Sequence, residues 1–258
     1  MLQYRVYNHE KSEEWVVFLH GFGGSSSIWF KQVQSFAKEF NLLLIDLKGH
    51  GRSEAKTPYT AKYSYYEIAC DVIKVLDSLR LGSCHFVGVS LGTIVVRKIA
   101  EIDISRVKSM SMAGAVVKLN FRSNFLMRMA QILQHIIPYM WIYRFYSRIL
   151  MPKKRHEEAR KIFIYDAIKM KQKEFLRWLS LTTNLNALLY LFRSVELPIP
   201  TLYLMGDEDY MFLPQVKALL KTHNQHSSLE IIPNSGHICN VDNAHFFNVK
   251  TLNFLTEN

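Results

Sequence analysis

The sequence has few cysteines, and their positions suggest neither a disulfide framework nor a metal site. The three residues Cys70, Cys84 and Cys239 are an odd number at wide spacings. Cys70 and Cys84 lie in apolar runs, so we interpret them as small buried side chains. Internal repeats and low-complexity tracts are also missing, which argues against a repeat array or a disordered chain. We therefore expect an ordinary globular core and no bound metal.

Targeting and membrane-spanning segments are missing as well. Residues 1–7 contain no basic region followed by an apolar core, so we expect no secretory signal and a cytoplasmic location. A spanning helix needs roughly twenty uninterrupted apolar residues. The most apolar helical stretch, near residues 120–150, is interrupted by Arg128, Pro138 and Arg144. No transmembrane segment is expected.

Acidic residues are absent between Asp103 and Glu157, although the whole chain carries a net charge of +10. The entire excess lies between Lys118 and Trp178, where 14 basic residues face 4 acidic ones. No stacking or groove-reading motif accompanies this charge, so nucleic acid is not an expected partner. Two interpretations stay open for the basic cluster, which either attracts an anionic substrate or a membrane surface or forms a solvated face. It comprises Lys153, Lys154, Arg155, Arg160 and Lys161.

The hydrophobic pattern predicts an α/β fold with a mostly parallel, doubly wound sheet. Apolar strand-like runs alternate with amphipathic helical runs joined by short loops, which is typical of a parallel sheet covered on both faces. The expected strands are 2–8, 15–20, 41–45, 84–89, 107–117, 201–205 and 228–232, and the clearest helices are 65–79, 216–220 and the segment from 244. Residues 119–190 instead predict only helices. We therefore expect a core of residues 1–118 and 191–258, with residues 119–190 inserted as a helical cap over the sheet.

The segment Gly88-Val89-Ser90-Leu91-Gly92 connects an apolar strand to a helical run. This Gly-x-Ser-x-Gly pattern in a strand–turn–helix context is typical of a nucleophile elbow, with Ser90 as the nucleophile. A serine hydroxyl needs a base and a group that orients the base. Both follow later strands, in the loops Gly206-Asp207-Glu208-Asp209 and Ser235-Gly236-His237. We expect His237 to accept the Ser90 proton and Asp209 to orient the imidazole, with Asp207 as the rival acid.

With these motifs, His20-Gly21-Phe22-Gly23 and the loop from Asp46 to Ser53 complete a resemblance to α/β-hydrolase fold serine hydrolases with a helical cap. The similar group includes small carboxylesterases, pimeloyl-ester hydrolases and the menaquinone-pathway synthase. The resemblance implies Asp209 as the acid and an oxyanion hole formed by the backbone N–H groups of Phe22 and Leu91. It also implies structural roles for the remaining candidate side chains of the early loops, which are His20, His50, Asp46 and Arg52. His245 lies within the last helix.

The cap has no counterpart that identifies a substrate. We expect Phe22, Met129 and Trp141 to contact the substrate. The apolar cap residues either line an acyl pocket or pack the cap helices together. These cap residues are Phe125, Leu126, Met129, Ile132, Leu133, Ile136, Ile137, Met140 and Trp141. The leading hypothesis is cofactor-free cleavage of an ester or thioester of a small, possibly anionic acyl substrate through an acyl-enzyme. The alternatives are a C–C hydrolase, a lyase or synthase of the menaquinone type, or a ligand-sensing protein without turnover.

Overall fold

A seven-stranded sheet forms the centre of the computed structural model, which describes residues 1–53, 63–134 and 136–258. The strand order is β1-β3-β2-β4-β5-β6-β7, and only β1 runs antiparallel to its neighbour. The strands are β1 (Tyr4–Tyr7), β2 (Trp15–Leu19), β3 (Asn41–Ile45), β4 (Cys84–Val89), β5 (Val107–Ala113), β6 (Thr201–Gly206) and β7 (Ser227–Ile232). This is the mostly parallel sheet that the alternating pattern predicts.

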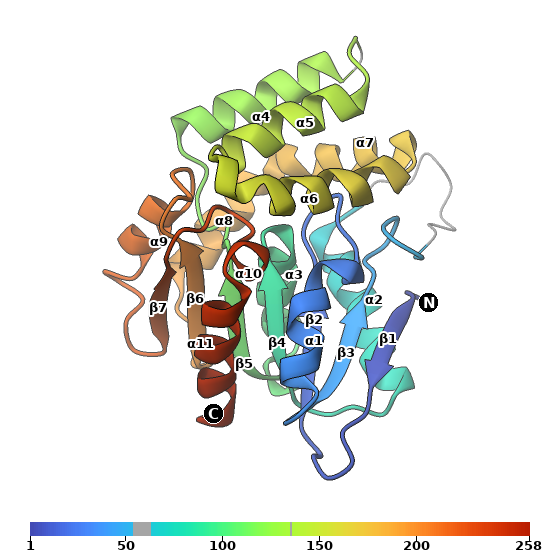
Figure 1. The fold of residues 1–258 in the computed structure, drawn as a ribbon, viewed down its shortest axis with the longest axis vertical. Coiled ribbons are helices and arrows are strands. Elements are labelled where there is room, and N and C mark those ends of the chain that lie inside the picture. The colour runs from blue at the N-terminus through green and yellow to red at the C-terminus, as the bar shows by residue number, and fades with distance from the viewer. Residues whose placement is uncertain (54–62, 135) are drawn as a thin grey trace.

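Helices cover both faces of the sheet, because its inner strands are apolar on both sides. On β2, Val17 and Leu19 pack into one core and Val16 and Phe18 into the other, since successive strand residues point to opposite faces. The first core contains α2 (Tyr65–Ser78) and α3 (Leu91–Ile102), and the second contains α1 (Phe30–Phe36) and α11 (Ala244–Thr256). Figure 1 shows these two helical layers on either side of the strands.

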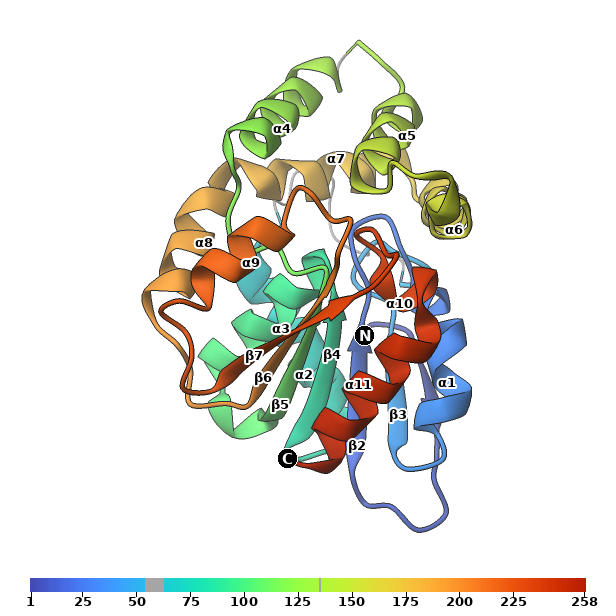
Figure 2. The same cartoon turned by 60° about the vertical axis from the view of Figure 1, so that its left-hand side comes forward.

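Five helices follow β5 before the chain returns to β6: α4 (Phe121–Leu133), α5 (Tyr139–Leu150), α6 (Glu157–Lys169), α7 (Gln172–Leu181) and α8 (Leu185–Ser194). We call α4 to α7 the cap helices, because they lie across the carboxyl ends of the strands (Figures 1 and 2). Helix α8 leads the chain back to β6, and Figure 2 shows it near α9 (Leu213–Leu219). The boundaries of the expected core and cap domains stay a prediction. Within the described ranges, none of the helices is both long enough and apolar enough to cross a membrane.

The strand expected at 107–117 ends earlier than its apolar pattern suggests. Strand β5 stops at Ala113 because Gly114 adopts a φ of +50°, a left-handed conformation that glycine accepts readily. The N–H of Gly114 still donates to the carbonyl of Leu204, 2.9 Å away, on the neighbouring strand. The chain therefore turns out of the sheet at the same edge where Gly206 ends β6.

Candidate active site

Ser90 occupies a strained turn between β4 and α3. Its φ of 54° and ψ of −117° are rarely adopted by a residue with a side chain, and such strain is typical of functional turns. The neighbouring glycines permit close backbone packing there. A Cβ atom at Gly88 would lie 2.9 Å from the carbonyl carbon of Gly92, and one at Gly92 would overlap the carbonyl oxygen of Leu19. The turn thus presents the Ser90 hydroxyl at the carboxyl edge of the sheet.

The structure brings Ser90, His237 and Asp209 together in one hydrogen-bonded row. The Nε2 atom of His237 lies 2.8 Å from Ser90 Oγ, and its Nδ1 atom lies 2.7 Å from Asp209 Oδ2. His237 and Asp209 are each 1% exposed. Because the ionised carboxylate only accepts hydrogen bonds, Nδ1 carries the proton toward Asp209. Nε2 is then free to accept the Ser90 proton. This is the geometry required of an activated serine.

Asp207 and Asp209 have different neighbours, although they are two residues apart. Asp209 uses its second oxygen, Oδ1, to accept a hydrogen bond from the N–H of Phe212 at 3.0 Å, so both of its oxygens are occupied. Asp207 Oδ1 accepts from the N–H of Ser235, also at 3.0 Å, and so joins the two loops. Of the two candidate acids, the structure therefore brings Asp209 to the imidazole of His237.

Two backbone contacts fix the position of His237, one from the turn at Gly114 and one from cap helix α5. Gly114 packs so closely beneath it that a Cβ atom there would overlap the His237 carbonyl oxygen. The N–H of His237 donates to the carbonyl of Leu150, 3.4 Å away, at the end of α5. The position of the imidazole therefore depends on a core turn and on a cap helix.

Two buried histidines fix the loop that follows β2. His20 Nε2 accepts a hydrogen bond from the N–H of Leu47 at 3.0 Å, so its Nδ1 is the nitrogen that donates to the carbonyl of Gly21 at 2.8 Å. His50 acts in the same way, accepting at Nε2 from the N–H of Gly23 and donating from Nδ1 to the carbonyl of Lys48. Burial lowers the pKa of both imidazoles, most strongly that of His50. Both side chains therefore act as neutral braces, which agrees with their implied structural role.

Asp46 braces the same region from the other side. Its Oδ1 accepts from the N–H of Ser26 at 2.7 Å, and its Oδ2 accepts from the N–H of Arg52 at 3.0 Å. Both carboxylate oxygens are therefore used to join loops. This arrangement matches the scaffold role that the resemblance implies for the 46–53 loop.

The two backbone amides expected in the oxyanion hole flank Ser90. Within the described part of the chain, neither the N–H of Phe22 nor that of Leu91 donates to a protein acceptor. The loop before Phe22 touches the nucleophile, because a Cβ atom at Gly21 would lie 3.1 Å from Ser90 Cβ. Helix α3 begins at Leu91, and its positive end faces the same space. Both amides are thus available for an oxygen bound beside Ser90.

A cavity of about 140 Å³ opens onto Ser90 and His237 beneath the cap helices. None of the described residues that line it is Asp, Glu, Lys or Arg, and its hydroxyl groups come from Tyr65, Ser90, Ser123, Tyr143, Tyr146 and Thr182. The apolar lining comprises Phe22, Leu91, Ile94, Val116, Leu119, Leu126, Met127, Ala130, Ile142, Leu150, Phe163, Phe175, Leu179, Leu185, Met211 and Phe212, with Tyr65, Tyr143 and Tyr146 beside them. The site is therefore suited to an uncharged, apolar group.

Trp141 and Met129 do not line this cavity, so the structure does not bring them to Ser90 with Phe22, and their contact with a substrate stays a prediction. Trp141 is 73% exposed, and Met129 lies beside the lining residue Ala130 without reaching the cavity. The reason is helical phase. The inward positions of α4 are 123, 126, 127 and 130, and those of α5 are 142, 143, 146 and 150. Of the apolar cap residues named above, Leu126 lines the cavity, whereas Phe125, Ile132 and Ile136 are exposed.

Phe22 does line the cavity, and it contacts cap residues that the sequence reasoning missed. Its ring stacks on Phe175 of α7 with centroids 5.0 Å apart. Its carbonyl oxygen accepts a hydrogen bond from the Tyr143 hydroxyl of α5 at 2.8 Å. Tyr143 in turn stacks on Phe163 of α6 at 4.3 Å. These aromatics lie one on each of three helices, so no spacing within the sequence could have indicated them.

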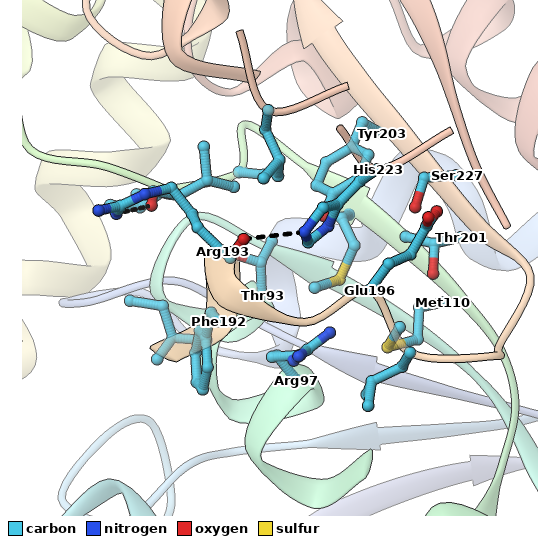
Figure 3. Close-up of a pocket in the computed structure, with 17 residues that line it drawn as sticks. Thr93, Arg97, Met110, Phe192, Arg193, Glu196, Thr201, Tyr203, His223 and Ser227 are labelled. Carbon is cyan, nitrogen blue, oxygen red and sulfur yellow. Dashed lines mark hydrogen bonds between the residues drawn. The ribbon is translucent and has the colours of Figure 1, made fainter. Parts of the chain in front are cut away.

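A second, smaller cavity lies between α3, β5, β6 and α8 (Figure 3). Its volume of about 30 Å³ suits one or two water molecules. His223, which lies at its centre, is directed at the carbonyl oxygen of Arg193 at 3.0 Å. This cavity shares only Ile94 and Val116 with the cavity at Ser90. In the described ranges, no group of three or more His, Cys, Asp or Glu side chains is placed to hold a metal ion.

The basic cluster is largely paired within the protein. Lys153 Nζ lies 2.6 Å from Glu208 Oε1, and Arg155 lies 3.8 Å from the other oxygen of the same carboxylate. Arg160 donates to the carbonyls of Met151 and Lys153, and Lys161 pairs with Glu157. Lys154, Arg155 and Lys161 are exposed and therefore solvated, although neighbouring carboxylates neutralise part of the cluster's charge.

Comparison with known proteins identifies the family. The alpha/beta hydrolase fold family matches residues 14–244, which is most of the chain. The protein belongs to this family, and the predicted fold is confirmed. It is a hydrolase of the α/β fold.

Individual relatives are distant. RutD of Stutzerimonas stutzeri (strain A1501), a provisionally assigned carbamate hydrolase, is 25% identical over 260 residues, which cover 94% of this chain and 91% of RutD. Among solved structures, MenH from S. aureus superposes with a TM-score of 0.84 at 19% identity, covering 100% of this chain and 99% of MenH. The enol-lactonase from Burkholderia xenovorans LB400 has a TM-score of 0.82 at 18% identity, with coverages of 99% and 96%. At these identities the structural likeness supports the fold alone.

Proposed function

We propose that the protein is a serine hydrolase that cleaves an ester or thioester of a small, neutral, apolar acyl group through an acyl-enzyme. The observation that carries this proposal is the row of hydrogen bonds from Ser90 Oγ through His237 to Asp209, at 2.8 and 2.7 Å, at the mouth of an apolar cavity. A serine activated in this way attacks carbonyl carbon. Asp209 stabilises the imidazolium that forms when His237 takes the proton.

The chemical steps follow from these positions. Ser90 Oγ forms a bond to the acyl carbon as its proton moves to His237 Nε2, and the carbonyl oxygen becomes negative. The N–H groups of Phe22 and Leu91 stabilise that oxygen, and removing one such donor typically costs about a hundredfold or more in rate. His237 then protonates the departing alcohol or thiol. Water repeats the attack on the acyl-enzyme, with His237 again accepting the proton, and the carboxylic acid leaves.

The size and polarity of the cavity support the choice of acyl group. Its volume of about 140 Å³ is close to that of an apolar protein cavity that holds benzene. An anionic acyl group would need a cation, and none of the described residues that line this space is Lys or Arg. A carbamate or lactone carbonyl could be attacked by the same steps, as the names of some relatives suggest. The predominantly apolar lining favours a hydrocarbon acyl group instead.

Hydrolysis of p-nitrophenyl esters with acyl chains of increasing length tests the proposal. We expect kcat/KM to be greatest near about six acyl carbons, to fall for longer chains, and to be far lower for a succinyl ester. Ser90→Ala should abolish turnover. Ser105→Ala is the matched control, because Ser105 bonds only to Asp103 on the core surface.

Three results would contradict the proposal in different ways. Equal turnover by Ser90→Ala and the unaltered protein would remove Ser90 as the nucleophile, whereas no turnover of any ester would remove the hydrolytic assignment and favour the lyase or sensing alternatives. Preference for the succinyl ester would retain the hydrolase but refute the neutral acyl group.

A further inference from the structure

The outer surface of the α4–α5 hairpin exposes several large apolar side chains. We call it the hairpin surface and define it by six exposed apolar residues and five cations: Phe121, Phe125, Ile132, Ile136, Trp141 and Phe145, with Lys118, Arg122, Arg128, Arg144 and Arg148. Ile136 is 77% exposed and Phe121 is 86% exposed. Figures 1 and 2 show that α4 and α5 lie farthest from the sheet.

Helical phase separates this surface from the cavity. On α4, positions 121, 125, 128 and 132 follow one stripe, and on α5 positions 141, 144, 145 and 148 follow another. The opposite sides of both helices line the cavity at Ser90. Each helix is therefore apolar on its inner side and carries both apolar residues and arginine on its outer side. The cavity explains the inner side, whereas the outer side has no partner within the described chain.

The cations of the hairpin surface are also unpaired. None of the five forms an ion pair or a side-chain hydrogen bond with a described residue, and no acidic residue occurs between Asp103 and Glu157. In contrast, Lys153, Arg155 and Lys161 all have acidic partners. Three of the five side chains in the basic cluster are thus paired with acids, whereas all five cations of the hairpin surface are unpaired among the described residues.

An open groove of about 670 Å³ between α5 and α6 continues this surface. Arg144, Arg148, Arg160 and Lys161 line it, against a single acidic residue, Glu157. Arg144 and Arg148 face it with their guanidinium groups unpaired among the described residues. Guanidinium groups bind phosphate oxygens in a bidentate manner. The groove therefore adds sites for anionic groups beside the exposed apolar residues.

We propose that the hairpin surface docks onto an anionic lipid bilayer, without crossing it. Exposed Trp, Phe and Ile side chains enter the interfacial layer, while the arginines contact lipid phosphates. Charge decides between this partner and a second copy of the chain. A symmetric contact would bring two sets of five unpaired cations together, which is repulsive, whereas a bilayer containing phosphatidylglycerol neutralises them. Docking also brings the apolar cavity near the lipid phase, and this one step rests on the proposed function.

Vesicle flotation tests the docking directly. We expect the protein to float with vesicles of phosphatidylcholine and phosphatidylglycerol at 70:30 and not with pure phosphatidylcholine, and to be released by added salt. Arg144→Gln with Arg148→Gln should lower the partition coefficient by roughly thirtyfold, since each cation near an anionic surface contributes about fivefold. Ile132→Ser with Ile136→Ser should also release the protein. Neither pair lines the cavity at Ser90.

Lys11→Gln with Lys38→Gln is the charge-matched control, because both lysines are exposed. They lie in the loops β1–β2 and α1–β3, which Figure 1 shows at the end of the molecule opposite to α4 and α5. This pair should change binding less than twofold. Ser90→Ala should bind vesicles normally, so a failure of the proposed function would leave the docking result intact. An unchanged rate on a short p-nitrophenyl ester shows that the hairpin variants are folded.

Three results would overturn the proposal. They are absence of flotation with the anionic vesicles, equal loss of binding in the Lys11/Lys38 control, and a concentration-dependent dimer that Ile132→Ser with Ile136→Ser abolishes in the absence of lipid. The last result would assign the surface to a second copy of the chain. The first of these results, combined with capture of an acidic protein, would assign the surface to that protein instead of the bilayer.

Discussion

The hydroxyl of Tyr143 donates a hydrogen bond to the carbonyl oxygen of Phe22, 2.8 Å away and 121 residues earlier in the chain. The bond connects cap helix α5 to the loop after β2, in which the preceding residue, Gly21, packs against Ser90. Burial raises the pKa of Tyr143 well above its ordinary value, so the phenol keeps its proton and remains a donor. The carbonyl of Phe22 belongs to the peptide unit that follows the proposed oxyanion-hole N–H, so the cap helps to hold the loop at Phe22 in place.

Tyr143→Phe should lower kcat about fivefold with little change in KM, since a neutral hydrogen bond contributes about 1 kcal/mol. The ring keeps its stacking on Phe163, so the fold should persist. Tyr146→Phe is the matched control, because that hydroxyl bonds to Leu126 within the cap. Steady-state kinetics on a short ester give both numbers. A larger effect of Tyr146→Phe, or a change confined to KM, would show that Tyr143 does not position the loop.

Asp209→Asn should reduce kcat by about 10⁴-fold, as is typical when the acid of such a triad loses its charge, because the amide favours the wrong imidazole tautomer. Asp207→Asn keeps an oxygen that can accept from the N–H of Ser235, and it should cost less than about tenfold. Rates on a short ester decide between them. Equal losses, or the reverse order, would mean that Asp209 is not the orienting acid.

His85 should make stability fall as the pH is lowered. Burial, aided by the charge of Lys108, lowers the pKa of this fully buried imidazole to about 4, although Glu14 acts in the opposite direction. The unfolded chain has a value near ~6.5. The folded state therefore favours neutral His85, and this contribution is complete above the unfolded pKa and is lost as the pH falls toward 4. It amounts to about 3 kcal/mol in total, of which about 2 kcal/mol is lost by pH 5.

Urea unfolding at pH 7.5 and pH 5 measures this loss. We expect the free energy of unfolding of His85→Gln to depend less on pH, by about 2 kcal/mol over this range. His245→Gln, at an exposed position on α11, should leave the pH dependence unchanged. Identical slopes in the unaltered protein and in His85→Gln would refute the assignment.

The sequence predicts the core of this protein well, because its signals there are local. A buried strand such as β4 is a continuous apolar run, and Ser90 follows it within a glycine pattern that few other turns require. The chain order of serine, acid and histidine then indicates His237 and two candidate acids. Only folding distinguishes the acids, since the loop orientation that brings Asp209 to His237 is not encoded in residue type.

The cap is less predictable because its helices are apolar on more than one side. Periodicity cannot tell whether Trp141 or Ile142 faces the cavity when both belong to apolar stripes. Pairing across the chain is also invisible in sequence, as with Lys153 and Glu208, 55 residues apart. The positions of these side chains are therefore known only from the folded structure.

Labelling by a fluorophosphonate, followed by peptide mapping, tests the central claim most directly, because the probe bonds only to a serine that its neighbours activate. Our account predicts one equivalent of probe on Ser90, equal labelling of Ser105→Ala, and no labelling of Ser90→Ala or His237→Ala. Modification of a different residue, or equal labelling after Ser90 is replaced, would contradict it.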